Sequence, residues 1–291
     1  MIHPKYLMRR ARNLINLRFE PARSRFAANA RKLQAAQVEQ RELIDVMPGI
    51  ELPMVIHPDM YFRTAYTDAI FEPNTLYFIH DQLRPGQIVV DVGANIGYFS
   101  LLLASIVGSV GRVIAFEPGE FAFGLLQRNC DLNKFDWLEA YSIGLAEQSG
   151  VVTFNSGPPG MEVYNSISKT HYQQTELPGS FQQVNIQVVA GDAWLQDHAV
   201  DHVDFMKIDV EGGEYAVLRG LKSMLQEHRI TKLLIEVTEE MSYAFGYDPS
   251  DIITLLQSYG YNWHRLEGGG KLTPFDNQFS LKYPMLLASV A

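Results

Sequence analysis

Cysteine is almost absent from this chain, and long apolar runs are missing. The 291 residues include one cysteine, Cys130, which excludes an internal disulfide framework and a zinc site built from cysteines. Such low cysteine use agrees with a reducing compartment, so we expect a cytoplasmic location. The longest apolar run, 101–110, contains two serines and a glycine and is shorter than the ~18 residues that span a bilayer. The N-terminus also lacks the apolar core of a signal peptide, and the sequence predicts no membrane span.

Positive charge is scarce outside the N-terminal segment. The formal net charge is −9, yet residues 1–45 hold ten Lys or Arg against four Asp or Glu, so the rest of the chain is strongly acidic. An acidic body argues against a large nucleic-acid footprint. Over 5–44, arginines alternate with apolar residues as in a helix that Pro21 should interrupt. We expect a basic helical extension over 1–45 that packs on the body or forms a homodimer contact; the alternative is a membrane-surface or nucleic-acid-binding helix.

The most informative segment is 89–100, where an apolar strand ends in an acid and a glycine-rich turn opens a helix. Its sequence is VVDVGANIGYFS, which places Asp91, Gly93 and Gly97 in the pattern Asp-x-Gly-x-x-x-Gly. Glycine permits a left-handed backbone and lets a ligand approach the main chain closely. The start of a helix also presents unpaired N–H groups. The pattern therefore predicts a cofactor over this turn.

The charge at the turn indicates which cofactor it binds. The spacing differs from the Gly-x-Gly-x-x-Gly of dinucleotide folds, and Asp91 would repel the pyrophosphate of a dinucleotide. S-adenosylmethionine is favoured by the same acid, because it carries a sulfonium and an ammonium group. A second apolar strand, 113–116, is followed by Glu117, which can accept hydrogen bonds from both ribose hydroxyls. The alternatives are a solvated strand end for Asp91 and a plain turn acid for Glu117.

Several segments of the chain resemble the FkbM family of S-adenosylmethionine-dependent methyltransferases. In chain order they are VVDVGANIGYFSLLLA (89–104), VIAFEPG (113–119), the Asn129…Asn133 helix end, DFMKIDVEGGEYAVLRGLKSML (204–225) and LLIEV (233–237). The resemblance implies cofactor contacts from the glycine turn and from Glu117, with Glu72 reaching the methionine end and Ile143–Gly144 bordering the adenine. The cofactor-binding residues that we expect are Asp91, Gly93, Ala94, Asn95, Gly97, Phe116, Glu117, Pro118, Glu72, Ile143 and Gly144.

The element order and this resemblance together predict an α/β fold. We expect a Rossmann-like class I methyltransferase sheet, mostly parallel and seven-stranded with an antiparallel last strand, and helices on both faces. The expected parts are the extension 1–45, a hairpin and helix over 46–85 that cover the body, and the methyltransferase domain 86–291. Within this domain we interpret 150–190 as an insertion that forms a lid on the substrate side, because long polar loops in compact domains are usually functional or mobile; the alternative is a disordered connection.

Three further expectations concern single elements. One helix is expected over 213–227, because its apolar residues fall on one face. Another is expected over 251–259, capped near Ser250 or Asp251. The segments 261–266 and 283–290 should form the closing antiparallel pair of the sheet.

Acids lie at the carboxyl ends of the expected strands, where open α/β sheets bind ligands. Lys207, Asp209 and Glu211 alternate along one strand and so should point the same way, and Glu236 ends the next strand. A buried ammonium needs a carboxylate partner, which Asp209 or Glu236 could supply. We predict that Asp209 removes the proton of an acceptor hydroxyl, with Lys207 and Glu236 orienting it and Glu211 in the same cluster. The alternative is a structural Lys–Glu pair that bridges two strands.

A metal ion is a second possibility for this cluster. Asp209 and Glu236 could hold Mg²⁺, which prefers oxygen ligands, but two acids make a thin metal site and we predict none. The sequence thus predicts a S-adenosylmethionine-dependent O-methyltransferase, and the resemblance suggests a small-molecule acceptor such as a sugar or a secondary metabolite. The alternatives are a NAD-dependent oxidoreductase, a non-catalytic binding protein on a methyltransferase fold, and RNA 2′-hydroxyl methylation, which the acidic body disfavours.

Overall fold

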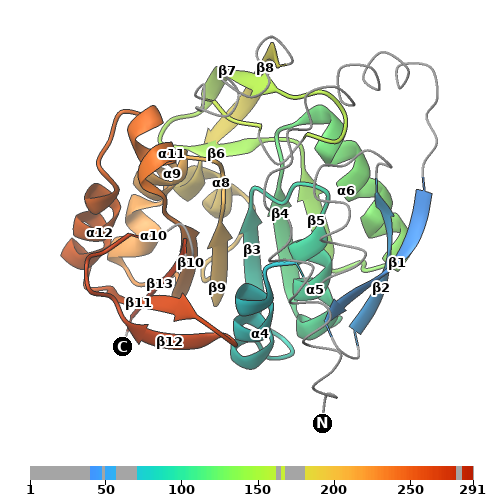
Figure 1. The fold of residues 1–291 in the computed structure, drawn as a ribbon, viewed down its shortest axis with the longest axis horizontal. Helices are drawn as coiled ribbons and strands as arrows, with labels where there is room; N and C mark the ends of the chain where they lie inside the picture. Colours follow the sequence, from blue (N-terminus) through green and yellow to red (C-terminus); the bar gives the residue numbers. More distant parts are fainter. Residues whose placement is uncertain are drawn as a thin grey trace, which may run out of the picture.

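A computed structural model describes residues 40–47, 50–56, 71–161, 165–167, 181–279 and 284–290 (Figure 1). The expected basic extension before residue 40 lies outside the described residues, so the helix, its dimer contact and its other possible roles stay predictions. Within the described part, no helix combines the length and the apolar character needed to cross a bilayer.

The core is an eight-stranded sheet in the order β12-β11-β13-β10-β9-β3-β4-β5. Five neighbouring strands run parallel, and three of them are short apolar runs buried along almost their whole length, as expected when helices cover both faces of a sheet. These parallel strands are β3 (Ile88–Val92), β4 (Arg112–Phe116), β5 (Leu138–Tyr141), β9 (Phe205–Ile208) and β10 (Lys232–Glu236).

The other end of the sheet is antiparallel. Strand β13 (Met285–Ser289) lies between β10 and β11 (Asn262–Glu267) and runs antiparallel to both, which confirms the expected closing pair. An eighth strand, β12 (Lys271–Pro274), adds a hairpin to β11 and extends the seven-stranded sheet that the sequence predicts. The triple-glycine segment 268–270 forms the turn of this hairpin.

Helices cover both faces of the sheet, each with its own apolar core, because alternate residues of a strand point to opposite faces. Val89 packs into one core with α4 (Pro73–Gln82), α5 (Tyr98–Val107) and α6 (Glu120–Asn133). Val90 packs into the other core with α8, α9, α10 and α12. These helices span Gly191–Asp197, Glu214–Gly220, Lys222–Gln226 and Pro249–Ser258, and α11 spans Glu239–Ala244.

Two helices differ in detail from expectation. The helix expected over 213–227 is interrupted at Leu221, so the prediction of one continuous helix is wrong. Asp192 accepts hydrogen bonds from the N–H groups of Ser223 (2.6 Å) and Met224 (3.0 Å), which caps α10 as a new helix. Helix α12 is capped by Asp248 in a capping box with Asp251, so the cap lies before the residues that we expected.

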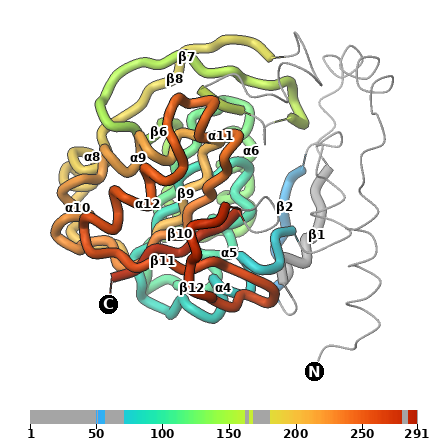
Figure 2. Tube along the Cα trace, turned by 60° about the vertical axis from the view of Figure 1, so that its left-hand side comes forward, coloured from blue at the N-terminus to red at the C-terminus, as the bar shows by residue number. Residues whose placement is uncertain are grey.

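Two strands of the insertion join a preceding strand in a second, three-stranded sheet in the order β6-β8-β7, which we call the inserted sheet. Its strands are β6 (Gly144–Ala146), β7 (Gly150–Ser156) and β8 (Gln182–Ala190), and β7 pairs antiparallel with β8. Figure 1 shows this sheet beyond the carboxyl ends of the parallel strands, and Figure 2 shows β7 and β8 arching above the helices. The small sheet therefore lies on the side of the candidate site.

A hairpin precedes the domain. Strand β1 (Gln40–Met47) pairs antiparallel with β2 (Ile50–Ile56), so a helix that continues to residue 44 is wrong for its last residues. Pro48 and Gly49 favour a turn, which lets the apolar run of β2 pair with the preceding segment. Figure 2 shows β2 along the flank of the domain. The buried side chain of Asn129 accepts from the N–H of Val55 at 2.6 Å and donates to the oxygen of Ile96 at 2.7 Å, which ties the hairpin to the glycine turn.

Candidate functional site

The glycine turn after β3 has the backbone that its sequence predicts. Gly93 and Gly97 have φ values of 86° and 92°, in the left-handed region. A Cβ on Gly93 would lie 1.8 Å from the main-chain oxygen of Asp209, so no side chain fits there. The N–H groups of Gly93 and Ala94 both donate to the oxygen of Phe116 at 3.0 Å. These two N–H groups are therefore paired within the protein, and a ligand here would meet the turn by close approach.

Two acceptor atoms at this turn are buried without a hydrogen-bond partner among the described residues. Asp91 is 1% exposed; its Oδ2 accepts from the Ser100 hydroxyl at 2.6 Å, while its Oδ1 accepts nothing. The side-chain oxygen of Asn95 is also orphaned. Burial raises the pKa of Asp91, and the nearby Lys207 ammonium opposes that rise. Orphaned acceptors are rare in folded proteins and are suited to a ligand that brings donors or positive charge.

Glu117 is held in one orientation at the end of β4. Its Oε2 accepts from the N–H of Asn95 at 2.9 Å and its Oε1 accepts from the N–H of Gly119 at 2.8 Å. The ring of the neighbouring Phe116 is fully buried and packs edge-on to Trp194, so only the main chain of Phe116 lies at the turn. The structure thus brings Glu117 to the glycine turn, as expected.

The residues expected near an adenine lie beside this acid. A Cβ on Gly144 would lie 3.7 Å from Pro118 Cγ, which places the start of β6 against the turn after β4. Ile143 precedes this glycine and packs on the apolar core of the same face. Pro118 and Gly144 therefore lie side by side, although they come from different segments.

Lys207 lies in the centre of the site and is 1% exposed. Its ammonium nitrogen lies 2.7 Å from Oδ2 of Asp209 and 4.7 Å from the centroid of the Phe99 ring. Burial alone would lower the pKa of Lys207, but the carboxylates of Asp209, Glu72 and Asp91 outweigh burial and raise it. The lysine is therefore charged, and Asp209 is its direct partner.

Glu72 joins the same group from outside the central sheet. It is the residue before α4, with a left-handed φ of 43°, and its Oε2 accepts from the Thr75 hydroxyl at 2.9 Å. Burial raises the pKa of Glu72 to about 7, against the attraction of Lys207 and with added repulsion from Asp209. Its position agrees with the expectation that this acid reaches the site.

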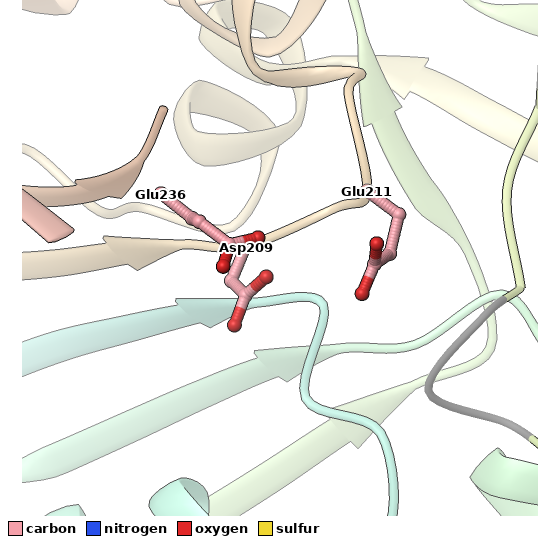
Figure 3. A group of neighbouring side chains, drawn as sticks. All are labelled: Asp209, Glu211 and Glu236. Carbon is pink, nitrogen blue, oxygen red and sulfur yellow. The ribbon is translucent and has the colours of Figure 1, made fainter. Parts of the chain in front are cut away.

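Three carboxylates meet at the ends of β9 and β10. The ligand atoms of Asp209, Glu211 and Glu236 all lie within 4.8 Å of one another, and Figure 3 shows the three side chains converging. Burial, followed by repulsion from Asp209, raises the pKa of Glu211 and of Glu236 well above the ordinary value. Acids at this spacing need a shared proton, a cationic group or a metal ion nearby, and oxygen ligands of this kind suit Mg²⁺.

Glu211 reaches this cluster by a different route from the one that the alternation predicts. Strand β9 ends at Ile208, and Glu211 lies in the following turn with a left-handed φ of 54°. A simple strand alternation that includes Glu211 is therefore wrong, although its carboxylate still joins Asp209. Left-handed backbone at a residue that carries a side chain is uncommon and is characteristic of functional turns.

Sequence reasoning missed two residues that shape this turn. Glu214 is 2% exposed, and its Oε1 accepts from the N–H groups of Val210 (3.0 Å) and Gly212 (3.1 Å). Its position directly after two glycines was a usable signal for a turn-closing acid. The Ser166 hydroxyl donates to the main-chain oxygen of Glu211 at 2.9 Å, and nothing in the polar sequence around Ser166 marks it.

The fold and the site together define the class of protein to which this chain belongs. The structure has the framework of a class I methyltransferase. This framework consists of a parallel sheet with an antiparallel strand at one end, a glycine turn after its central strand and an acid after the next strand. The family model described as the methyltransferase FkbM domain matches residues 91–262. The chain belongs to this FkbM family and is a S-adenosylmethionine-dependent methyltransferase.

Curated relatives agree with this assignment at moderate identity. "Methyltransferase 1" of Beauveria bassiana is 27% identical, over 78% of this chain and 90% of its own length. The hexuronic acid methyltransferase AglP of Haloferax volcanii is 28% identical, over 64% of this chain and 67% of its own. The 31-O-demethyl-FK506 methyltransferase FkbM of Streptomyces tacrolimicus is 26% identical, over 69% of this chain and 80% of its own.

Proposed function

We propose that this methyltransferase transfers its methyl group to a hydroxyl oxygen of a small molecule. The observation that carries the proposal is the convergence of Asp209, Glu211 and Glu236 beside a charged Lys207, one strand away from the glycine turn. The names of two relatives, a hexuronic acid methyltransferase and a 31-O-demethyl-FK506 methyltransferase, support an oxygen acceptor on a sugar acid or a macrocycle.

The residues of the glycine turn fit the methyl donor. When bound, S-adenosylmethionine supplies a methyl group on a sulfonium, which is a good leaving group. Asp91 and Asn95 would offer buried acceptor atoms to its cationic and hydroxyl groups, and Glu117, held by two main-chain N–H groups, would accept hydrogen bonds from its ribose hydroxyls. Gly93, Ala94, Gly97, Phe116 and Pro118 would meet it with main chain or small side chains, Ile143 and Gly144 would border its ring, and Glu72 would face its methionine end.

The residues at the ends of β9 and β10, which we call the acceptor side, would act on the hydroxyl that receives the methyl group. Asp209 would hold the hydroxyl and take its proton on the carboxylate, while Lys207 fixes the orientation of that carboxylate through the 2.7 Å contact. Burial and repulsion from Asp209 raise the pKa of Glu236 and of Glu211 beside it, so these two acids favour binding of a proton. Alignment of this kind contributes up to about 7–11 kcal/mol in intramolecular models, and a positioned base typically contributes about 10²–10⁴-fold in rate.

Binding measurements test the donor side first. Calorimetric titration of the purified protein with S-adenosylmethionine, S-adenosylhomocysteine and NADH should give binding to the first two alone. Asp91→Asn should weaken S-adenosylmethionine about 10–100-fold, because a charged hydrogen bond of about 1.5–3 kcal/mol is lost. Asp131→Asn, an exposed acid on α6, serves as the matched control and should leave binding unchanged.

Methyl transfer then tests the acceptor side. The labelled donor is incubated with a panel of hexuronic acids, neutral sugars and hydroxylated macrocycles, and the product is analysed for an O-methyl group. Transfer to one of these hydroxyls supports the proposal. A protein that binds the donor tightly and methylates only amines, thiols or RNA contradicts it, and one that binds the donor but methylates nothing supports a binding role instead.

A further inference from the structure

The inserted sheet reaches back to the acid cluster through the short segment 165–167. Ser166 forms an antiparallel bridge with Asn155 of β7, with N–H to oxygen distances of 2.8 and 3.2 Å. The side-chain amide of Asn155 also donates to the oxygens of Ser166 and Ile167 at 3.1 Å each. Ser166 is fully buried, so the position of its hydroxyl is fixed by its own main chain.

The same segment touches both sides of the site. The side-chain oxygen of Asn165 accepts from the N–H of Gly157 at 2.7 Å. Its amide nitrogen lies 3.1 Å from the point where a Cβ on Gly119 would lie, and the Glu117 carboxylate is 2.8 Å from that point. One residue further along, Ser166 donates to Glu211. The segment thus spans the distance between the turn after β4 and the turn after β9.

The turn that contains Glu211 is strained and is held from two directions. Its left-handed φ of 54° is unfavourable for a residue that carries a side chain. On one side, Glu214 accepts from the N–H groups of Val210 and Gly212. On the other side, the only hydrogen bond from the inserted sheet to this turn among the described residues is the one from Ser166 to the oxygen of Glu211.

Electrostatic repulsion from neighbouring acids favours movement of the Glu211 carboxylate away from this position. Asp209, Glu214 and Glu72 repel its carboxylate, Glu236 lies beside it, and Lys207 attracts it. No described residue donates a hydrogen bond to the carboxylate. The oxygens of these carboxylates lie within 4.8 Å of one another and repel when they are ionised, so rotation of the Glu211 side chain towards water would relieve the repulsion.

We propose that Ser166 is a positioning residue, which holds the main chain of Glu211 so that its carboxylate stays beside Asp209 and Glu236. Ser166 does not touch the reacting atoms and acts only through Glu211. The role of this carboxylate at a site of hydroxyl deprotonation rests on the proposed function. The positioning of Glu211 by Ser166 does not depend on it. The inserted sheet would then take part in catalysis by shaping the acid cluster, besides any role as a cover.

The test follows Glu211 directly by carbon-13 NMR of labelled glutamate carboxyls during a pH titration. Glu211→Gln assigns the resonance. Ser166→Ala removes the donor, Ser166→Thr retains it, and Ser149→Ala is the matched control, because Ser149 makes its 3.0 Å hydrogen bond to the N–H of Ala190 within the same sheet. The expected result is a titration midpoint of Glu211 that falls by about one unit, or tenfold in proton affinity, in Ser166→Ala alone.

An unchanged midpoint in folded Ser166→Ala overturns the proposal. If that variant does not fold, Asn155→Ala replaces it, since it loosens the bridge and keeps the hydroxyl; a lowered midpoint supports the proposal and an unmoved one overturns it. Calorimetry with S-adenosylhomocysteine on the same samples tests the proposed function separately. A protein that fails to bind this compound, while Glu211 still responds to Ser166, contradicts the donor-binding site and leaves the positioning role standing.

Discussion

The carboxylates on the two sides of the candidate site have different electrostatic environments. On the donor side, the turns after β3 and β4, Asp91 and Glu117 receive hydrogen bonds from a serine hydroxyl and from two main-chain N–H groups. On the acceptor side, the ends of β9 and β10, no described residue donates to the carboxylates of Glu211 or Glu236, which crowd against Asp209. The donor-side carboxylates are thus oriented by fixed dipoles, whereas on the acceptor side burial and repulsion from Asp209 raise the pKa of Glu211 and of Glu236.

This difference indicates a division of labour. A binding surface gains affinity when its groups are already oriented before the ligand arrives. A proton acceptor works best when its pKa lies near the working pH, which requires neighbours that disfavour its ionised form. The donor side has the first property, and on the acceptor side burial disfavours the ionised forms of Glu211 and Glu236. Substitutions on the two sides should therefore change different measured quantities.

The largest expected effect is that of Asp209→Asn on the acceptor side. Loss of the proposed base should slow methyl transfer about 10²–10⁴-fold, while the affinity for S-adenosylhomocysteine changes no more than a few-fold. Single-turnover rates and calorimetry on the same sample measure the two quantities. A variant with normal rate would remove Asp209 from the chemistry, and one that loses donor binding as well would erase the distinction between the two sides.

Lys207→Met should give the next largest effect, on folding. Removing one partner of a buried ion pair typically costs about 3–5 kcal/mol, and here the change leaves Asp209, Glu72 and Asp91 without their shared cation. Urea unfolding followed by circular dichroism measures the loss. Lys232→Met is the control, because this lysine on the neighbouring strand donates to the neutral Gln82 side chain at 2.8 Å and should cost about 1 kcal/mol.

Glu214 gives a pH dependence of known sign. Burial raises its pKa from an ordinary 4.5 to about 7, so the folded protein binds this proton more tightly than the unfolded chain does. The stabilisation is fully present below pH 4.5 and is lost as the pH rises through about 7, by about 3 kcal/mol at 1.36 kcal/mol per unit. Glu72 acts in the same direction.

Unfolding free energies at pH 5 and pH 8 measure this dependence. Glu214→Gln should flatten the difference between the two values. Glu139→Gln should not, because Arg112 lowers the pKa of Glu139 and the stabilisation from that pair is lost only in acid. A slope that survives in Glu214→Gln would assign the pH dependence to the acid cluster or to Glu72 instead.

The smallest expected effect is that of metal removal. We predict that dialysis against a chelator leaves methyl transfer within about twofold, because Lys207 and shared protons balance the cluster without a metal. Activity that disappears on chelation and returns with Mg²⁺ would instead make Asp209, Glu211 and Glu236 a metal site. The acceptor-side carboxylates would then be fixed by a metal ion, whereas those of the donor side are fixed by hydrogen bonds.

The sequence predicts most of the sheet and the acids on both sides of the candidate site, because these depend on short local patterns. The apolar strands before Asp91, Glu117 and Glu236 are buried runs with an acid at the carboxyl end, and parallel topology brings such ends to one edge. The strand pairs at the C-terminus and in the insertion follow from alternation. The glycine turn follows from positions where a side chain would collide with the main chain.

Long-range contacts account for what the sequence does not predict. The interruption at Leu221 depends on Asp192, which is distant in sequence and caps α10. The hairpin strand β1 depends on pairing with β2, which overrides the helical pattern of the preceding segment. The left-handed turn at Glu211 is held by Ser166, whose partner lies 45 residues away, and no local pattern marks such a hydrogen bond.

The side chain of Asn129 connects the N-terminal hairpin to the glycine turn, since one amide group bonds to both Val55 and Ile96. A shortened protein that begins after residue 56 would leave that amide without two of its partners at the edge of the donor-binding loop. An N-terminal truncation made to ease crystallisation should therefore weaken cofactor affinity, although the hairpin contributes none of the expected cofactor-binding residues.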